Sequence, residues 1–229
     1  MNKRAHLPSA VKVGRITRMP NQLRKQDTYH HGNLRDALIA AGIFLLDTQG
    51  ADALSLRGAA RLAGVSQTAP GHHFQDKRGM LAAIATKGFE QLTTKRLEML
   101  TISMSAEERL RALMLGYVLF AIERPALFNL MFGSELADKD DYEELRMASI
   151  ASFRLLMHAI ADHLQAHKLP ASYAEAAAVH VWSATHGLST LLVHRQQNPR
   201  QKLQATEQCR ALANVLIAGL TADIKGSTS

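Results

Sequence analysis

Five of the eleven histidines in this 229-residue chain lie close together in its C-terminal half, where they could bind a metal ion. They are His158, His163, His167, His180 and His186. His163 and His167 stand four positions apart, which places both rings on one face of a helix, in an arrangement that can hold zinc. A metalloprotease helix would have a Glu directly after the first histidine, and this sequence has none there. Helical histidines without a metal explain the pattern better, and we assign no metal ligand.

Covalent catalysis finds no support in the motifs of the chain. The sequence contains no Gly-x-Ser-x-Gly nucleophile elbow, no phosphate-binding loop and no Gly-x-Gly-x-x-Gly after a strand. The single cysteine, Cys209, excludes an internal disulfide framework and fits a reducing compartment. We therefore expect a protein that is not an enzyme and needs no cofactor. A metal-dependent enzyme built on the C-terminal histidines is the least favoured alternative.

The composition does favour binding to phosphate. The net charge is +7 and it is unevenly distributed: residues 1–80 carry 12 Lys and Arg against 5 Asp and Glu, whereas residues 81–229 carry 15 of each. Clustered positive charge attracts the phosphate backbone of nucleic acid, because binding releases condensed counterions. Seven of the basic residues lie in residues 1–27, which we expect to form a disordered arm able to follow the minor groove or the phosphates.

Residues 54–77 read as two short helices joined by a tight turn, an element that could bring this charge to DNA. Ser55 can cap the first helix, and Gly64 can end it because glycine adopts the left-handed conformation without steric cost. Ser66 can cap a second helix that begins at Gln67. This is the pattern of a helix-turn-helix, whose second helix enters the major groove. Such pairs also occur as plain packing units, and the spacing alone leaves that alternative open.

The rest of the chain also reads as helix, so the predicted fold is all-α with about nine helices. No run of alternating β-branched or aromatic residues would pass for a strand. The other expected helices are 31–48, 76–104, 107–123, 126–133, 139–168, 172–195 and 201–224. No segment approaches the roughly 20 consecutive apolar residues of a membrane span, so we expect a cytoplasmic protein with no membrane partner.

Four parts are expected along the chain. A basic arm covers residues 1–27, and a three-helix DNA-binding domain with the helix-turn-helix covers 28–76. A larger helical domain for ligand binding and dimerisation covers 77–224, and a short tail covers 225–229.

Three N-terminal segments resemble the tetracycline-repressor (TetR) family of regulators. They are residues 29–34 (YHHGNL), 50–57 (GADALSLR) and 63–77 (AGVSQTAPGHHFQDK). The resemblance extends over residues 29–85 without a gap. It implies an all-helical homodimer that binds a palindromic operator in double-stranded DNA and releases it when a small molecule enters the larger domain.

The resemblance also assigns roles to single residues. Arg57 and Gln67 match positions that reach base edges, where Arg can bind guanine and Gln can bind adenine. The positions that contact phosphate are matched by Ser55, His73 and Lys77. The complete predicted DNA-binding set is Ser55, Leu56, Arg57, Ser66, Gln67, Thr68, Ala69, Pro70, His72, His73 and Lys77. Gly71 departs from the family, which usually has a Tyr there to pack on the sugar-phosphate backbone. Because glycine in mid-helix lowers helix propensity and the adjacent Pro70 lacks an N–H, the recognition helix is expected to be short and loose.

The C-terminal part resembles one subtype of the family, named for its Trp-His-Gly signature. The resemblance rests on residues 123–133 (ERPALFNLMFG) and on Trp182, His186 and Gly187. The C-terminal part contains many Met and Phe residues. Each of them is best explained as a core residue, but together they suit an adaptable apolar pocket. The predicted pocket residues are Met99, Met114, Tyr117, Phe120, Phe128, Met131, Phe132, Phe153, Met157, Trp182 and His186.

The last two helices are expected to form the dimer as a four-helix bundle. Their predicted interface residues are Val181, Ala184, Leu188, Leu191, Leu192, Leu212, Val215, Leu216 and Leu220. We therefore expect a homodimeric repressor that is released from its operator by a small apolar or aromatic effector. An activator of the same fold and a non-specific DNA-binding protein remain as alternatives.

Overall fold

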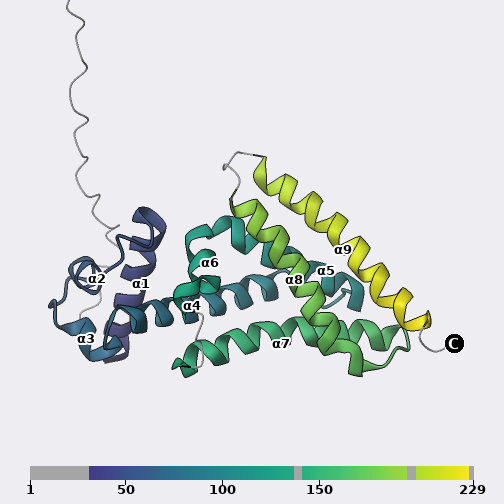
Figure 1. Cartoon of the computed structure of the whole chain (residues 1–229), viewed down its shortest axis with the longest axis horizontal. Coiled ribbons are helices and arrows are strands. Elements are labelled where there is room, and N and C mark those ends of the chain that lie inside the picture. Colours follow the sequence, from purple (N-terminus) through teal and green to yellow (C-terminus); the bar gives the residue numbers. More distant parts are fainter. Residues whose placement is uncertain (1–30, 137–140, 195–199, 227–229) are drawn as a thin grey trace, which may run out of the picture.

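A computed structural model describes residues 31–136, 141–194 and 200–226, which form nine α-helices and no strand, as predicted (Figure 1). The helices are α1 (His31–Gln49), α2 (Leu56–Ala63), α3 (Ala69–Phe74), α4 (Lys77–Glu98), α5 (Ala106–Glu123), α6 (Pro125–Phe132), α7 (Glu143–Ala166), α8 (Ala174–Val193) and α9 (Gln201–Gly226). Short 3-10 helices lie at Ser134–Leu136 and Ala171–Tyr173. The predicted arm at residues 1–27, residues 29–30 of the family motif and the end of the tail lie outside the described residues.

The first three helices gather at one end of the molecule, and α4 runs from them into the larger helical part (Figure 1). There α4 packs against α5, α6 and α7, while α9 packs on α5 and α8. Within residues 31–136, 141–194 and 200–226, no single helix is both long and apolar enough to cross a membrane. Only α5 and α6 taken together meet that requirement, and a bend of 107° separates them.

Two apolar cores hold this arrangement. The first joins α1, α2 and α3 to α4 and α6, with Leu38, Leu54, Phe74, Met80 and Ile84 all buried. The second joins α5, α7, α8 and α9. Because full burial of a Leu-sized side chain contributes roughly 1.5–3 kcal/mol, the first core fixes α4 firmly to the N-terminal helices.

Capping hydrogen bonds begin α2 and α5, and of these two caps the one at Ser55 is predicted by the sequence. The Ser55 hydroxyl accepts a hydrogen bond from the Gly58 N–H (3.1 Å) at the start of α2. At the start of α5, Ser105 and Glu108 form a capping box, each side chain accepting from the backbone N–H of the other residue.

The long helix predicted for residues 76–104 is shorter than expected, because α4 ends at Glu98. The Met99 N–H turns back to the carbonyls of Arg96 and Leu97, which closes the last turn. Ile102, which follows the end of α4, is fully exposed, so its burial does not stabilise a longer helix. The capping box at Ser105 then starts α5.

The second helix of the helix-turn-helix begins at Ala69, two residues later than predicted. Ser66 does not cap it; its hydroxyl lies 3.0 Å from the Thr68 hydroxyl instead. Pro70 stands in the first turn of α3, where a missing N–H is tolerated, and it is buried. The recognition helix is therefore only six residues long.

The start of α7 also differs from the prediction of a helix from Lys139. The helix begins at Glu143, and Lys139 lies outside the described residues. Likewise, α8 begins at Ala174 after a 3-10 turn that contains Ser172.

Candidate functional site

The helix-turn-helix is built as the glycine pattern indicates. Gly64 has a φ of 73°, and its N–H and that of Val65 bond to the carbonyls of Arg61 and Ala60, which ends α2. Val65 turns toward the first core. The chain is thereby redirected into α3 within a few residues.

Most of the predicted DNA-binding residues lie on the surface. The exposed ones are Ser55, Arg57, Ser66, Gln67, Thr68, His72 and Lys77. Ala69 and His73 are partly buried, Leu56 packs against the first core, and Pro70 is buried. Pro70 and Leu56 therefore help to position α2 and α3 against the first core.

Buried contacts on its inner side anchor the short recognition helix. Phe74 is 5% exposed and packs in the first core, and the Arg35 guanidinium of α1 lies 5.8 Å from its ring centroid. Gly71 and His72 face outward, and a Cβ added at Gly71 would meet no atom within 4 Å. A large side chain at position 71 therefore has room.

The junction between α3 and α4 is tightly constrained. Gln75 has a positive φ of 62°, and the Asp76 carboxylate accepts a hydrogen bond from the Gly79 N–H (2.8 Å) as the N-cap of α4. A Cβ at Gly79 would lie 2.1 Å from the Phe74 carbonyl oxygen, so only glycine fits there. This junction sets the angle at which the recognition helix leaves α4.

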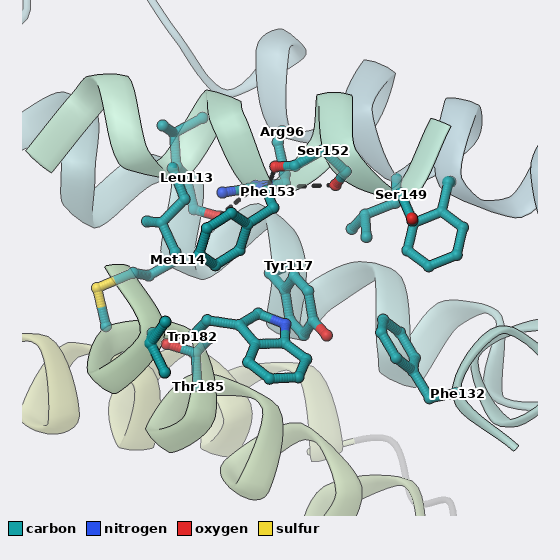
Figure 2. A pocket seen from close by; sticks show the side chains of 14 residues that line it. Arg96, Leu113, Met114, Tyr117, Phe132, Ser149, Ser152, Phe153, Trp182 and Thr185 are labelled. Carbon is teal, nitrogen blue, oxygen red and sulfur yellow. Dashed lines mark hydrogen bonds between the residues drawn. The ribbon is translucent and has the colours of Figure 1, made fainter. Parts of the chain in front are cut away.

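A cavity of about 200 Å³ lies between α4, α5, α7 and α8 (Figure 2). Five predicted pocket residues line it, namely Met114, Tyr117, Phe132, Phe153 and Trp182. The other lining residues are Phe89, Leu92, Arg96, Leu113, Ser149, Ser152, Leu156, Val179 and Thr185. The sequence therefore predicted most of the aromatic residues of the cavity but missed Phe89, the aliphatic residues and the polar groups Arg96, Ser149, Ser152 and Thr185.

Six predicted pocket residues do not line this cavity. They are Met99, Phe120, Phe128, Met131, Met157 and His186. Phe120, Phe128 and Met131 are at most 3% exposed and fill the first core. Packing in a core explains the helical spacing of these residues as well as a place in the pocket would. His186 lies directly behind the wall, with Nδ1 2.9 Å from the Tyr117 hydroxyl oxygen and its ring stacked on Trp182.

Arg96 is the one charged residue among the lining residues that the sequence did not predict. It is 3% exposed, and its guanidinium donates hydrogen bonds to the carbonyls of Leu113 (3.3 Å) and Ser152 (2.8 Å). Burial lowers the pKa of Arg96 to about 10, so the side chain stays protonated at neutral pH. The sequence does contain a sign that Arg96 is buried, because Phe89, Leu92 and Arg96 follow one another at helical spacing and thus share the apolar face of α4.

The predicted dimer residues on α8 and α9 fall into two groups. Leu191 and Val215 are 65% and 71% exposed, whereas Val181 and Leu192 are buried within the subunit. The remaining predicted residues, Ala184, Leu188, Leu212, Leu216 and Leu220, are partly buried. An apolar outer surface thus remains on α8 and α9.

The two histidines with zinc-binding spacing are His163 in α7 and His167 directly after its end, and their ring centroids lie 4.4 Å apart. His163 is fully buried with neither ring nitrogen hydrogen-bonded, and burial lowers its pKa. The His167 Nδ1 lies 2.9 Å from the His163 carbonyl oxygen. Within the three described segments, no group of three or more His, Cys, Asp or Glu residues could hold a metal ion.

Comparison with known proteins agrees with the helical architecture. Residues 110–216 match the family model described as tetracyclin repressor-like, C-terminal domain. No curated protein sequence matches the chain. Among solved structures, a protein of unknown function from Rhodococcus sp. RHA1 is 30% identical, with a TM-score of 0.70 over 86% of this chain and 100% of that one.

Two further structures share the fold at lower identity. The TetR regulator SCO7222 from Streptomyces coelicolor is 18% identical, with a TM-score of 0.64 over 82% of this chain and 97% of that one. The fatty acid degradation regulator FadR from Bacillus halodurans is 15% identical, with a TM-score of 0.65 over 84% and 98%. The chain thus has the fold of these regulators, and its residues 110–216 match the C-terminal domain of tetracyclin repressor-like proteins.

Proposed function

We propose that the chain is a homodimeric, ligand-responsive transcriptional regulator that works in the cytoplasm as a repressor and has no enzyme activity. In this proposal, residues 28–76 bind a palindromic operator in double-stranded DNA. Residues 77–224 bind a small apolar or aromatic effector and form the dimer, and the chain has the Trp-His-Gly subtype of C-terminal domain. The stacked Trp182 and His186 rings beside the cavity support that subtype.

The observation that carries the proposal is the course of α4. Its first half, with Met80 and Ile84, is buried in the same core as α1, α2 and α3. Its second half supplies Phe89, Leu92 and Arg96 to the cavity wall. A single 22-residue helix therefore connects the surface that would bind DNA to the site that would bind a ligand.

A second connection runs along α7. Ser149, Ser152 and Phe153 of α7 line the cavity, and near the N-terminal end of the same helix the Glu144 carboxylate forms an ion pair with Arg35 of α1. Arg35 in turn lies over the ring of Phe74 in the recognition helix. A shift of α7 would thus reach the helix-turn-helix by a route other than α4.

These contacts support a mechanism in which ligand binding changes the position of the helix-turn-helix. A ligand that fits the cavity better when α4 and α7 have moved would change the separation of the two recognition helices in a dimer. The helices would then lose their register with successive major grooves, and the operator would be released. The ligand must favour the displaced conformation, because a ligand with equal affinity for both conformations shifts nothing.

The test is selection of DNA by the purified full-length chain from a random duplex pool at low salt, without added ligand. We expect a palindromic consensus whose half-sites lie about one helical turn apart or somewhat more. Small molecules would then be screened for release of the best duplex. A chain that stays monomeric and retains no duplex would refute the proposal, and retention of all sequences alike would instead indicate a non-specific DNA-binding protein.

A further inference from the structure

Arg96 is a buried cation at the wall of the cavity without a buried anion to balance it. Its guanidinium is held by the carbonyls of Leu113 and Ser152 and, more weakly, by the Ser152 hydroxyl at 3.4 Å (Figure 2). None of the described residues that line the cavity is acidic. Carbonyl groups satisfy hydrogen bonds but do not neutralise a charge, so the site keeps an excess positive charge in apolar surroundings.

The guanidinium also keeps unused donors. Its hydrogen bonds to Leu113 and Ser152 engage Nε and Nη1, and no acceptor among the described side chains and backbone is bonded to Nη2. An arginine held in this way presents a fixed, planar edge, which suits a carboxylate better than a flexible lysine would. The carbonyls of Leu113 and Ser152 therefore orient Arg96 as well as hold it.

Three other polar side chains of the wall already have hydrogen-bond partners within the protein. The Thr185 hydroxyl donates to the Val181 carbonyl (2.7 Å), and the Ser149 hydroxyl donates to the Arg146 carbonyl (2.8 Å). The Tyr117 hydroxyl pairs with His186 at 2.9 Å. Arg96 is thus the one charged group among the described lining residues, so recognition of an anionic group in the cavity falls on it.

The remaining wall selects the body of the ligand. Aromatic rings of Phe89, Phe132, Phe153 and Trp182 line the cavity together with Leu and Met side chains. A volume of about 200 Å³ lies below the roughly 300–1,000 Å³ of drug-sized sites, so it suits one small ring system. Ring-on-ring contacts favour an aromatic body over an aliphatic chain of the same size.

We propose that this cavity binds a small aromatic carboxylic acid, with the carboxylate on Arg96 and the ring among the aromatic side chains. The inference deepens the proposed function, because it names the chemical class of the effector. Binding brings an anion to an uncompensated buried cation, so the acid gains more from the site than a neutral molecule of the same shape.

The test uses Trp182, the only tryptophan of the chain, as a reporter inside the cavity. Benzoic, phenylacetic and 3-phenylpropionic acids and their primary amides are titrated into the full-length chain without DNA, and the Trp182 emission is followed. We expect the best acid to bind at least about tenfold more tightly than its amide, as charge-assisted hydrogen bonds require. Equal affinity of acid and amide, or binding of none of the acids at millimolar concentration, would overturn the inference.

Variants then assign the preference to one side chain. Arg96→Met is expected to remove the difference between acid and amide, and Arg96→Lys to keep part of it. Arg154→Met, at an exposed arginine of α7, is the matched control and should bind like the wild type. If Arg96→Met does not fold, Arg96→Lys provides the test. A carboxylate contact at Arg96 predicts that this variant still prefers the acid to its amide, but less strongly than the wild type does. An unchanged preference in either Arg96 variant contradicts the inference.

Release of DNA is measured separately, which keeps the two proposals apart. An acid that binds at Trp182 but leaves a selected duplex bound would support the acid site and contradict its role as effector. A neutral compound that releases the duplex, while no acid binds, would support the regulator and refute the acid site.

Discussion

The Arg96 guanidinium donates a 2.8 Å hydrogen bond to the Ser152 carbonyl and thereby ties α4 to α7 at the wall of the cavity. Both helices extend from this bond toward the N-terminal helices, α4 through the first core and α7 through the ion pair between Glu144 and Arg35. A molecule bound at Arg96 would therefore act on both connections at once. This relationship explains how a small cavity could influence a surface at the other end of the chain.

Gly71→Tyr should strengthen DNA binding. Position 71 is exposed, and an added Cβ has no neighbour within 4 Å, so the ring can lie on the outer face of α3. Gly71→Ala should raise the free energy of unfolding by up to about 1 kcal/mol through helix propensity, without supplying a ring. Affinity for the selected duplex is measured by fluorescence anisotropy. A gain in Gly71→Ala as large as that in Gly71→Tyr would mean that helix stability, and not the ring, limits binding.

Arg57→Ala and Lys77→Ala should have different effects on DNA binding. Arg57 is expected to read a base, so its loss should relax the preference at one position of each half-site, by about 1–3 kcal/mol. Lys77 is expected to contact phosphate, so its loss should weaken all sequences alike and reduce the salt dependence. Repeating the selection with each variant distinguishes the two roles. Uniform weakening by Arg57→Ala would contradict base reading.

Gly79→Ala should destabilise the junction between α3 and α4. Its Cβ would clash with the Phe74 carbonyl oxygen, a backbone atom that cannot move without shifting the recognition helix. We expect a loss of about 1–3 kcal/mol in the free energy of unfolding and weaker DNA binding. Chemical denaturation measures the first effect, and Gly71→Ala serves as the control glycine. Wild-type stability of Gly79→Ala would show that this junction is less rigid than described.

The chain should lose stability in mild acid partly through His163. Because burial lowers the pKa of His163, the unfolded chain takes up a proton at a higher pH than the folded chain does. Neutral His163 makes its full contribution to the free energy of unfolding above the usual histidine pKa of about 6.5. This contribution is lost as the pH falls from there through the lower pKa of His163 in the folded chain. His163→Leu should reduce this loss.

His163→Leu should also raise the free energy of unfolding by about 1 kcal/mol at neutral pH, because neither ring nitrogen of the buried His163 is hydrogen-bonded. His158→Leu, at an exposed histidine of α7, is the matched control and should keep the wild-type pH profile. Unfolding by denaturant at several pH values provides the measurement. An unchanged profile in His163→Leu would exclude His163 as the source.

Val215→Glu should separate the proposed dimer. Val215 is 71% exposed on α9 although it is apolar, and a carboxylate buried there against a second subunit would lack a partner. Light scattering after gel filtration should show a monomer at concentrations where the wild type is a dimer. Ile102→Glu, at an exposed apolar residue outside α8 and α9, should behave like the wild type. Dimers of unchanged stability in Val215→Glu would place the interface elsewhere.

The sequence by itself determined the helices and most of their limits. Ser55 and Gly64 act on atoms within a few residues of themselves, so their effects can be read from the local pattern. Where the local signals were ambiguous, the prediction was wrong: α3 begins at Ala69 and not at Gln67, and α4 ends at Glu98 and not at Met104.

Only the tertiary structure decided which side chains share the cavity. Arg96, Leu113 and Ser152 come from three helices, and the bond between Arg96 and Ser152 joins residues 56 positions apart. Phe128 and Met131 are the same residue types as Phe132 and Met114, and all four were predicted to line the pocket. Phe128 and Met131 fill the first core, whereas Phe132 and Met114 line the cavity. Helical spacing tells which face of a helix is buried, whereas the packing of distant helices decides whether that face meets a neighbour or an open space.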